Sequence, residues 1–196
     1  MKKERTSELF TVPNILSLTR VLLTPIFIWA MIQRRPWLAF GIFLLAGITD
    51  GLDGFTARLF HLKTNLGIWL DPLADKVLLT AAFVVLCLPR LSVPNALPIG
   101  LTIVCIGRDV MIALGALVYT WLRGRTTFKP TLLGKASTIC QVTVLTVVLL
   151  LNGLAETPGF LSRLYGLTAA LTVLSGIQYI YITLRRFASR TEKAQA

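Results

Sequence analysis

The sequence predicts an all-α integral membrane protein with six transmembrane helices and both termini in the cytoplasm. Hydrophobic residues make up 55% of the chain and its mean hydropathy is +0.72, which is more apolar than a soluble domain. Apolar runs long enough to cross a bilayer recur along the chain, without the period-two alternation of a membrane β-barrel. We expect one membrane domain over residues 1–196, with a short polar N-terminus at 1–10 and a C-terminal tail at 185–196.

Each expected span is an apolar run of about 20 residues, the length that a helix needs to cross the hydrocarbon core. The first three runs have charged or polar ends, whereas the fifth and sixth contain no charged residue. The fourth is uncharged from Leu91 to Gly107 and continues past Arg108 and Asp109 to Leu122. In chain order, the six expected spans are 14–33, 37–57, 67–88, 91–122, 136–155 and 164–184.

The distribution of Lys and Arg predicts the orientation of these spans. An even number of spans places both termini on one side, together with the second and fourth loops, and most cations lie on that side. Because cytoplasmic loops carry the excess of Lys and Arg, we expect that side to face the cytoplasm, in a bacterial inner membrane. The opposite side has four basic residues: Arg34, Arg35, Arg90 and Arg163.

The net charge of +11 has two interpretations. Basic rims beside anionic lipid headgroups are usual for inner-membrane proteins, and buried cations are also suited to an anionic substrate. Nucleic-acid binding is not expected, because little of the chain lies outside the spans.

Four of the nine acidic residues lie in one stretch between apolar runs: Asp50, Asp53, Asp71 and Asp75. A carboxylate near a bilayer is costly, so it is a candidate for function. Spacings of three and four residues place each pair on one face of a helix, and two such helices in an antiparallel hairpin would bring the four carboxylates together. Such a set requires a counter-charge, and its oxygen atoms suit Mg²⁺ or Mn²⁺. The sequence therefore predicts a metal site at the cytoplasmic face of the membrane.

The aspartates belong to a longer pattern with fixed spacing: Asp50-x-x-Asp53-Gly54-x-x-Ala57-Arg58, eight residues, then Gly67-x-x-x-Asp71-x-x-x-Asp75. This pattern resembles the signature of the CDP-alcohol phosphotransferase family. The likeness extends to Pro13-Asn14-x-x-Ser17-x-x-Arg20 in the first span and to residues 71–76. The resemblance implies a membrane enzyme that uses a CDP-linked donor and two divalent ions, Mg²⁺ or Mn²⁺, releases CMP and forms a homodimer.

The resemblance also implies roles for the aspartates. Asp50, Asp53 and Asp71 would bind the metal ions, a ligand set that suits the neutralisation of a diphosphate. Asp75 would contact metal and, as the catalytic base, would take the proton of the acceptor hydroxyl. A structural ion-pair network with nearby cations is the alternative interpretation of the four carboxylates.

Six further residues are expected at the donor site. Small residues beside the aspartates would let the cytidine lie close to the helix backbone, and a guanidinium would pair with the diphosphate. Tight helix packing is the alternative interpretation of the small residues. The expected donor-binding residues are Gly54, Ala57, Arg58, Gly67, Asn14 and Arg20.

Three cations outside the pattern are expected at the acceptor site: Arg108, Lys135 and Lys129. Arg108 lies deep in the fourth span and must pair, either with Asp109 or with a bound phosphate. Lys129 and Lys135 lie near the cytoplasmic start of the fifth span, where a basic side chain can also extend to the headgroups without any further role.

The expected acceptor depends on finer similarities. The first half of the chain resembles both phosphatidylglycerophosphate synthases and cardiolipin synthases. The second half, with residues 108–111, 129–131 and the spacing Lys135-x-x-Thr138-x-x-Gln141, is more similar to cardiolipin synthases. We therefore expect phosphatidyl transfer from CDP-diacylglycerol to phosphatidylglycerol, with glycerol 3-phosphate as the alternative acceptor.

Two other classes of membrane protein also place carboxylates in the bilayer. Membrane prenyltransferases bind a diphosphate through Asp motifs, but these motifs belong to separate repeats of a larger chain. A cation-coupled transporter would not require Gly54, Ala57 and Arg58 in register with the aspartates, and inverted repeats are absent from this sequence.

Overall fold

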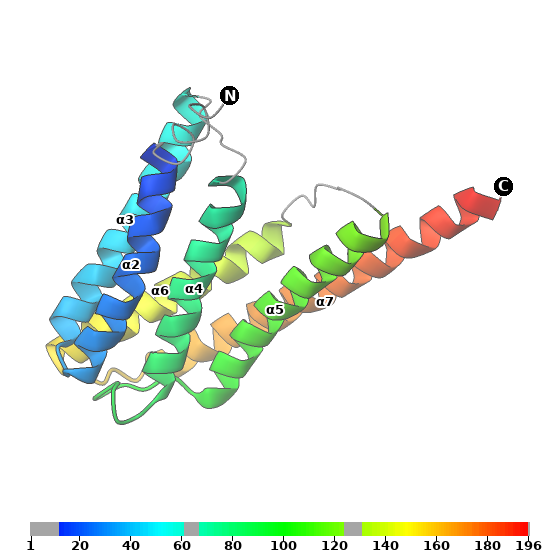
Figure 1. Cartoon of the computed structure of the whole chain (residues 1–196). Helices are drawn as coiled ribbons and strands as arrows, with labels where there is room; N and C mark the ends of the chain where they lie inside the picture. Colours follow the sequence, from blue (N-terminus) through cyan, green and yellow to red (C-terminus); the bar gives the residue numbers. More distant parts are fainter. Residues whose placement is uncertain (1–11, 61–66, 124–130, 196) are drawn as a thin grey trace, which may run out of the picture. The chain divides into compact units, whose positions relative to one another are not determined.

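The structure, a computed structural model, is all-helical over the residues that it describes. These are residues 12–60, 67–123 and 131–195, with side chains described at 18–49, 76–118 and 131–183. This part of the chain confirms the predicted all-α class. Six helices follow one another within it (Figure 1): α2 (Val12–Ile32), α3 (Pro36–Phe60), α4 (Gly67–Cys87), α5 (Ile99–Arg123), α6 (Leu132–Leu154) and α7 (Leu161–Gln195).

Three helical segments in these ranges are long and apolar enough to cross a membrane: Ile99–Val118, Leu132–Leu154 and Leu161–Thr183. Helices α2, α3 and α4 each contain a shorter apolar segment. The number of six spans and the cytoplasmic location of the termini stay predictions.

Helix α5 begins later than the sequence predicted. The expected fourth span starts at Leu91, but the chain has turns and irregular structure until Pro98. Proline lacks a backbone N–H and restricts the residue before it, and Pro89, Pro94 and Pro98 all lie in this segment. The segment is apolar enough to resemble a span, so the expected start was wrong.

As expected, α5 continues past Arg108 and Asp109, from Ile99 to Arg123. One other boundary differs from the expected spans. Helix α7 continues through the expected C-terminal tail as far as Gln195, because nothing in that polar segment breaks a helix.

Unit 1 is one of two compact units in the chain. It comprises Met1–Leu97 and Leu145–Thr157, and therefore holds α2, α3, α4 and the C-terminal half of α6. Helix α2 packs against both α3 and α4, and the direction of the chain reverses from each helix to the next (Figure 1). Small side chains let helix backbones approach closely. Four alanines of these helices are fully buried: Ala30, Ala39, Ala46 and Ala82.

Unit 2 comprises Pro98–Val144 and Pro158–Ala196. Helix α5 packs along α7 (Figure 1), and the first half of α6 joins α7 through buried polar side chains. Ser137 Oγ lies 3.1 Å from Thr172 Oγ1, and Gln141 Nε2 donates to the same Thr172 oxygen at 3.4 Å. Buried polar groups in an apolar bundle must satisfy one another, because lipid offers them no hydrogen-bonding partner.

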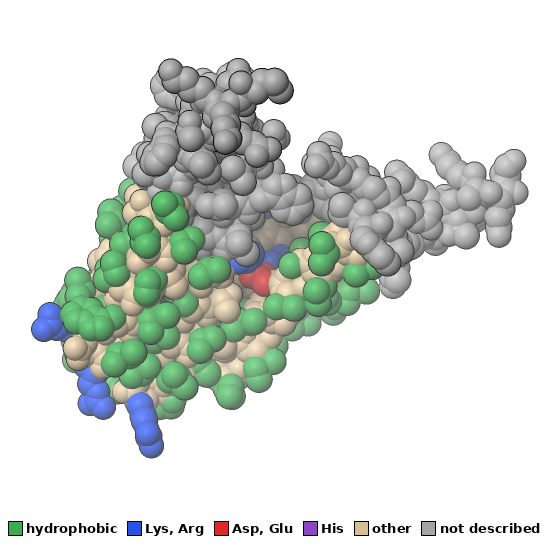
Figure 2. Space-filling model, in the orientation of Figure 1, with side chains coloured by type: hydrophobic (Ala, Val, Ile, Leu, Met, Phe, Trp, Pro, Cys, Tyr) green, Lys and Arg blue, Asp and Glu red, His purple; other side chains and the backbone are tan. Residues whose placement is uncertain are grey.

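Large apolar side chains are widely exposed, as expected for a surface that contacts lipid. Hydrophobic side chains predominate on the face in Figure 2, and basic side chains protrude at the end of unit 1 where α2 meets α3. On α5, Ile99, Ile103 and Leu117 are 69%, 63% and 63% exposed. Soluble monomers rarely expose contiguous apolar surface of this kind, so a bilayer is the medium that suits these helices.

Candidate functional site

The four aspartates lie on two consecutive helices of unit 1. Asp50 and Asp53 are in the second half of α3, and Asp71 and Asp75 are in the first turns of α4. Because α3 and α4 run in opposite directions and both pack against α2, the end of α3 and the start of α4 lie at the same end of unit 1 (Figure 1). The side chains of the four aspartates lie outside the described residues.

The chemistry of these residues fits a hard divalent cation. Groups of three or more His, Cys, Asp or Glu that could hold a metal are absent from the described residues, which do not include the aspartate side chains. The four aspartates offer carboxylate oxygens only, from helices that reach one end of unit 1. Oxygen ligands of this kind suit Mg²⁺ and Mn²⁺ better than softer metals.

Most of the expected donor-binding residues share this end of unit 1, but their side chains are not described. The residues concerned are Gly54, Ala57 and Arg58 on α3, Gly67 at the start of α4, and Asn14 on α2.

Arg20 is the donor-site candidate whose side chain the structure does describe. It lies on α2 and is only 1% exposed. The backbone carbonyl of Arg20 accepts a hydrogen bond from Thr24 Oγ1 at 3.0 Å. A buried guanidinium is costly unless it is paired, and Arg20 does take part in a further interaction. These contacts are compatible with a structural role as well as with binding the donor.

Arg108 is the candidate whose surroundings are described most fully. Its Nη1 donates to Asp109 Oδ1 at 2.8 Å, and the two side chains are only 10% and 15% exposed. Its Nη2 donates to Ser175 Oγ on α7 at 2.7 Å. Asp109 is therefore a partner of Arg108, as one of the two sequence alternatives required. The Nε of Arg108 is buried and has no hydrogen-bond partner in the described part of the chain.

The first turn of α6 lies beside this guanidinium. Thr131 caps the helix, because its Oγ1 accepts the backbone N–H of Gly134 at 3.1 Å. A Cβ added to Gly134 would lie 3.2 Å from Arg108 Nη2 and 3.1 Å from Thr131 Oγ1. The missing side chain of Gly134 thus leaves room for the guanidinium.

The two expected lysines flank this turn in the sequence. Lys135 follows Gly134 and is exposed, whereas Lys129 lies outside the described residues. Helix starts and guanidinium groups both attract anions, so the surroundings of Arg108 can orient an anionic oxygen group. Asp109 offsets part of the positive charge there.

Ser175 and Gly134 were missed by the sequence reading. Each is a small residue in an apolar helix, where close packing is the usual reason for its presence. The useful signal was the buried arginine itself, since an arginine inside a span needs more partners than one neighbouring aspartate supplies. That requirement predicts a polar residue on a facing helix without identifying which one.

Comparisons with known proteins agree with the aspartate pattern. Residues 10–188 match the family model described as CDP-alcohol phosphatidyltransferase. The chain is 40% identical over 135 residues to the cardiolipin synthase (CMP-forming) of Rattus norvegicus, a match that covers 68% of this chain and 42% of that protein. It therefore spans less than half the length of that relative.

Bacterial relatives of similar length are named for a different acceptor. The chain is 32% identical over 177 residues to the CDP-diacylglycerol–glycerol-3-phosphate 3-phosphatidyltransferase of Haemophilus influenzae, covering 88% of this chain and 93% of that protein. It is 33% identical over 189 residues to the Bacillus subtilis protein of the same name, covering 87% and 94%. Since the family model covers most of the chain and includes all four aspartates, the chain belongs to the CDP-alcohol phosphatidyltransferase family.

Proposed function

We propose that this protein transfers the phosphatidyl group of CDP-diacylglycerol to phosphatidylglycerol, which forms cardiolipin and releases CMP. The observation that carries the proposal is the complete aspartate pattern on α3 and α4, within a match to the family over residues 10–188. The reaction takes place at the cytoplasmic face of a bacterial inner membrane, where the loops are rich in Lys and Arg.

The residues of the pattern have different roles in the reaction. Asp75 takes the proton of the acceptor hydroxyl, whose oxygen forms a bond to the phosphatidyl phosphorus. The bond from that phosphorus to CMP breaks, and CMP leaves. Arg58 pairs with the diphosphate of the donor, helped by Asn14 and Arg20 on α2. Gly54, Ala57 and Gly67 leave room for the cytidine.

The aspartates also hold the metal that the family resemblance implies. Asp50, Asp53, Asp71 and Asp75 bind two divalent ions, Mg²⁺ or Mn²⁺, which when bound neutralise the diphosphate and stabilise the leaving CMP. The homodimer implied by the resemblance is part of the same proposal.

The acceptor is oriented by the cations outside the pattern. Arg108, held by Asp109 and Ser175, directs one of its other N–H groups toward a phosphodiester oxygen of phosphatidylglycerol, and Lys135 and Lys129 add positive charge. The acyl chains of this acceptor supply its membrane anchoring, so the polar contacts mainly set its position. The identity of 40% to a cardiolipin synthase supports this choice of acceptor.

Glycerol 3-phosphate is the second candidate acceptor. Two bacterial relatives that match along nearly their whole length are glycerol-3-phosphate 3-phosphatidyltransferases, with identities of 32% and 33%. The phosphate of glycerol 3-phosphate suits the same cations, so the choice between acceptors is a matter of product identity.

The test is to give the purified protein radiolabelled CDP-diacylglycerol with each acceptor in turn. We expect cardiolipin and CMP from phosphatidylglycerol. Phosphatidylglycerophosphate from glycerol 3-phosphate, without cardiolipin from phosphatidylglycerol, would replace the proposed acceptor but leave the roles of the aspartates unchanged.

Aspartate variants provide the matched controls for this assay. Asp71→Asn keeps the size of the side chain but removes its charge, so transfer to either acceptor should be lost. Asp75→Asn should lower turnover by about 10²-fold or more while CDP-diacylglycerol still binds, as measured by thermal-shift titration. Turnover that persists in excess chelator would refute the metal assignment.

A further inference from the structure

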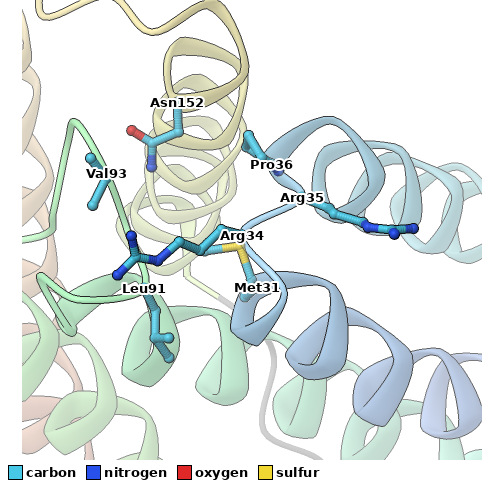
Figure 3. Close-up of a pocket in the computed structure, with 7 residues that line it drawn as sticks. All are labelled: Met31, Arg34, Arg35, Pro36, Leu91, Val93 and Asn152. Carbon is cyan, nitrogen blue, oxygen red and sulfur yellow. The ribbon is translucent and has the colours of Figure 1, made fainter.

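A pocket lies at the end of unit 1 opposite to the aspartates. Its volume is about 100 Å³, and it is formed by the α2–α3 turn, the loop 88–98 and the end of α6 (Figure 3). Apolar walls come from Met31, Leu91 and Val93, and Arg34, Arg35, Pro36 and Asn152 complete the lining. The pocket shares no residue with the proposed donor and acceptor sites.

Arg34 follows α2 in a left-handed backbone conformation, with φ of 53°. Its N–H donates to the Met31 carbonyl and the N–H of Arg35 donates to the Ala30 carbonyl, both at 3.0 Å, which is the Schellman pattern at a helix end. Glycine is the usual residue here, because a side chain is disfavoured in this conformation. A charged residue at a strained backbone position is a reason to look for function.

The two arginines of this turn point in different directions. Arg34 reaches across the pocket toward the loop that carries Leu91 and Val93, whereas Arg35 points away from it (Figure 3). The guanidinium of Arg35 lies 5.9 Å from the ring centre of Trp29, within range of a cation–π contact. Arg34 has no ion pair within the described residues, so its N–H groups can serve a ligand.

Hydrogen bonds hold the opposite wall of the pocket in place. Asn152 Oδ1 accepts the backbone N–H of Asn95 at 2.8 Å, and Asn152 Nδ2 donates to Ser92 Oγ at 2.9 Å. Asn95 Nδ2 donates to the carbonyl of Glu156 at 2.7 Å. These bonds tie the loop 88–98 to the end of α6. The pocket is therefore formed before any ligand arrives, which lowers the cost of binding.

If α3 crosses the bilayer as the sequence predicts, the pocket lies in the other leaflet from the aspartates. Pro36 begins α3 at the pocket, and Asp50 and Asp53 lie in the second half of the same helix. At a rise of about 1.5 Å per residue, the separation is roughly 20 to 25 Å. That distance approaches the thickness of the hydrocarbon core, about 30 Å.

The surroundings of the pocket favour a lipid over a soluble anion. Trp29 and Trp37 are 47% and 53% exposed beside the α2–α3 turn, and tryptophan at a span end marks the membrane interface. Ile32 and Val93 are also more than half exposed nearby. A ligand that binds Arg34 therefore contacts exposed apolar side chains as well as a positive charge, which suits a lipid headgroup.

We propose that this pocket binds the phosphodiester headgroup of an anionic glycerophospholipid from the leaflet opposite to the aspartates. The Arg34 guanidinium donates to the phosphate oxygens, and Met31, Leu91 and Val93 contact the glycerol and the upper acyl chains. This binding is independent of the transfer reaction and of the acceptor that it uses.

The test is native mass spectrometry of the full-length protein in detergent, titrated with dioleoyl phosphatidylserine or dioleoyl phosphatidylcholine. The two lipids share acyl chains and a phosphodiester but differ in net charge, and phosphatidylserine lacks the glycerol hydroxyls of the proposed acceptor. Both lipids offer Arg34 a phosphate, but the choline cation of phosphatidylcholine repels the guanidinium, whereas phosphatidylserine adds a carboxylate, so we expect phosphatidylserine to bind about tenfold more tightly. In Arg34→Gly, which suits the left-handed backbone and should fold normally, the two affinities should become nearly equal.

Three controls make the proposal refutable. Arg35→Gln changes the arginine that points away and should keep the tenfold preference, whereas an undiminished preference in Arg34→Gly would refute the site. Asp71→Asn should also keep the preference, and its loss there would assign the lipid to the catalytic end. Displacement of phosphatidylserine by millimolar inorganic phosphate would show that the pocket takes a free anion and would refute the lipid assignment.

Discussion

Two buried polar clusters of this protein use their hydrogen bonds differently. In unit 1, both polar atoms of the Asn152 amide are fully engaged: Oδ1 accepts two bonds from Asn95, and Nδ2 donates to Ser92 and to the Asn95 carbonyl. In unit 2, Arg108 donates to Asp109 and Ser175 but keeps a buried Nε without a partner in the described part of the chain.

The difference separates a structural network from one that is suited to binding. A buried donor without a partner costs about 1–3 kcal/mol, so such a donor is informative when its neighbours are otherwise well paired. Asn152 has no capacity left for a ligand, and its removal should affect stability. Arg108 retains a buried Nε donor without a partner in the described residues, and removal of its side chain should affect the acceptor.

The largest expected effect is that of Arg108→Gln on transfer. The change removes the charge and the proposed contact to the acceptor phosphate, which is worth about 3 kcal/mol, or roughly 10²-fold in rate. With phosphatidylglycerol as acceptor the loss should appear mainly in kcat, because the acyl chains still anchor the lipid. With glycerol 3-phosphate it should appear mainly in acceptor KM. Steady-state kinetics with each acceptor distinguish the two cases.

Arg108→Lys is the matched control for charge. Lysine keeps the positive charge beside Asp109 but lacks the fork that reaches both Asp109 and Ser175. Compared with Arg108→Gln, Arg108→Lys should therefore regain most of the wild-type stability but less of the wild-type activity. Wild-type activity in both Arg108→Gln and Arg108→Lys would show that Arg108 does not bind the acceptor. The proposed functional difference between the two clusters would then be refuted.

The next effect is that of Asn152→Ala on stability. Four hydrogen bonds are lost, and the Asn95 N–H is left buried without its acceptor, so the free energy of unfolding should fall by about 2 kcal/mol. Unfolding by denaturant in detergent measures this change. Activity per folded molecule should stay at the wild-type level, and a selective loss of acceptor turnover would place the network in the reaction instead.

Ser175→Ala should have a smaller effect, because Arg108 keeps its ion pair with Asp109. Loss of the 2.7 Å bond frees one side of the guanidinium and should cost about 1 kcal/mol, a roughly fivefold fall in kcat with the acceptor. Donor KM should not change. The control is Ser137→Ala, which removes a buried serine of the same unit that contacts Thr172 and not Arg108. Equal kinetic losses in both variants would mean that Ser175 acts through packing alone.

Hydropathy predicted the helices of this fold better than their ends. All six expected spans overlap a helix, because uninterrupted apolar sequence in a membrane has to satisfy its backbone internally. The start of α5 was predicted at Leu91 because the prolines of the preceding loop interrupt the helix without interrupting the hydropathy. Helix α7 extends beyond the expected span 164–184, because the polar residues that follow end the apolar run but do not break the helix.

The sequence revealed groups with unusual charge, but few of their partners. The aspartate pattern identified the family because eight fixed positions carry it within one short stretch. Ser175 and Asn152 are separated along the chain from Arg108 and Asn95, and only tertiary packing brings them together. The left-handed residues Arg34 and Ala155 were not predicted either, because neither is a glycine.

The smallest expected effect compares these two helix ends. Ala155 has φ of 57° after α6, and the N–H of Glu156 donates to the Leu151 carbonyl at 3.1 Å, as the corresponding bond does after α2. Ala155→Gly should raise the free energy of unfolding by about 0.5 kcal/mol, the relief of the left-handed conformation less the entropy that glycine loses on folding. Ala170→Gly, in the exposed interior of α7, should lower it by about 1 kcal/mol. Suppose that Arg34→Gly and Ala155→Gly raise the free energy of unfolding equally, and that only Arg34→Gly changes lipid binding. The strained conformation after α2 then serves the lipid contact of the Arg34 side chain and does not serve the fold. If Arg34→Gly instead destabilises the protein, the guanidinium holds the turn together, and its position over the pocket serves the fold.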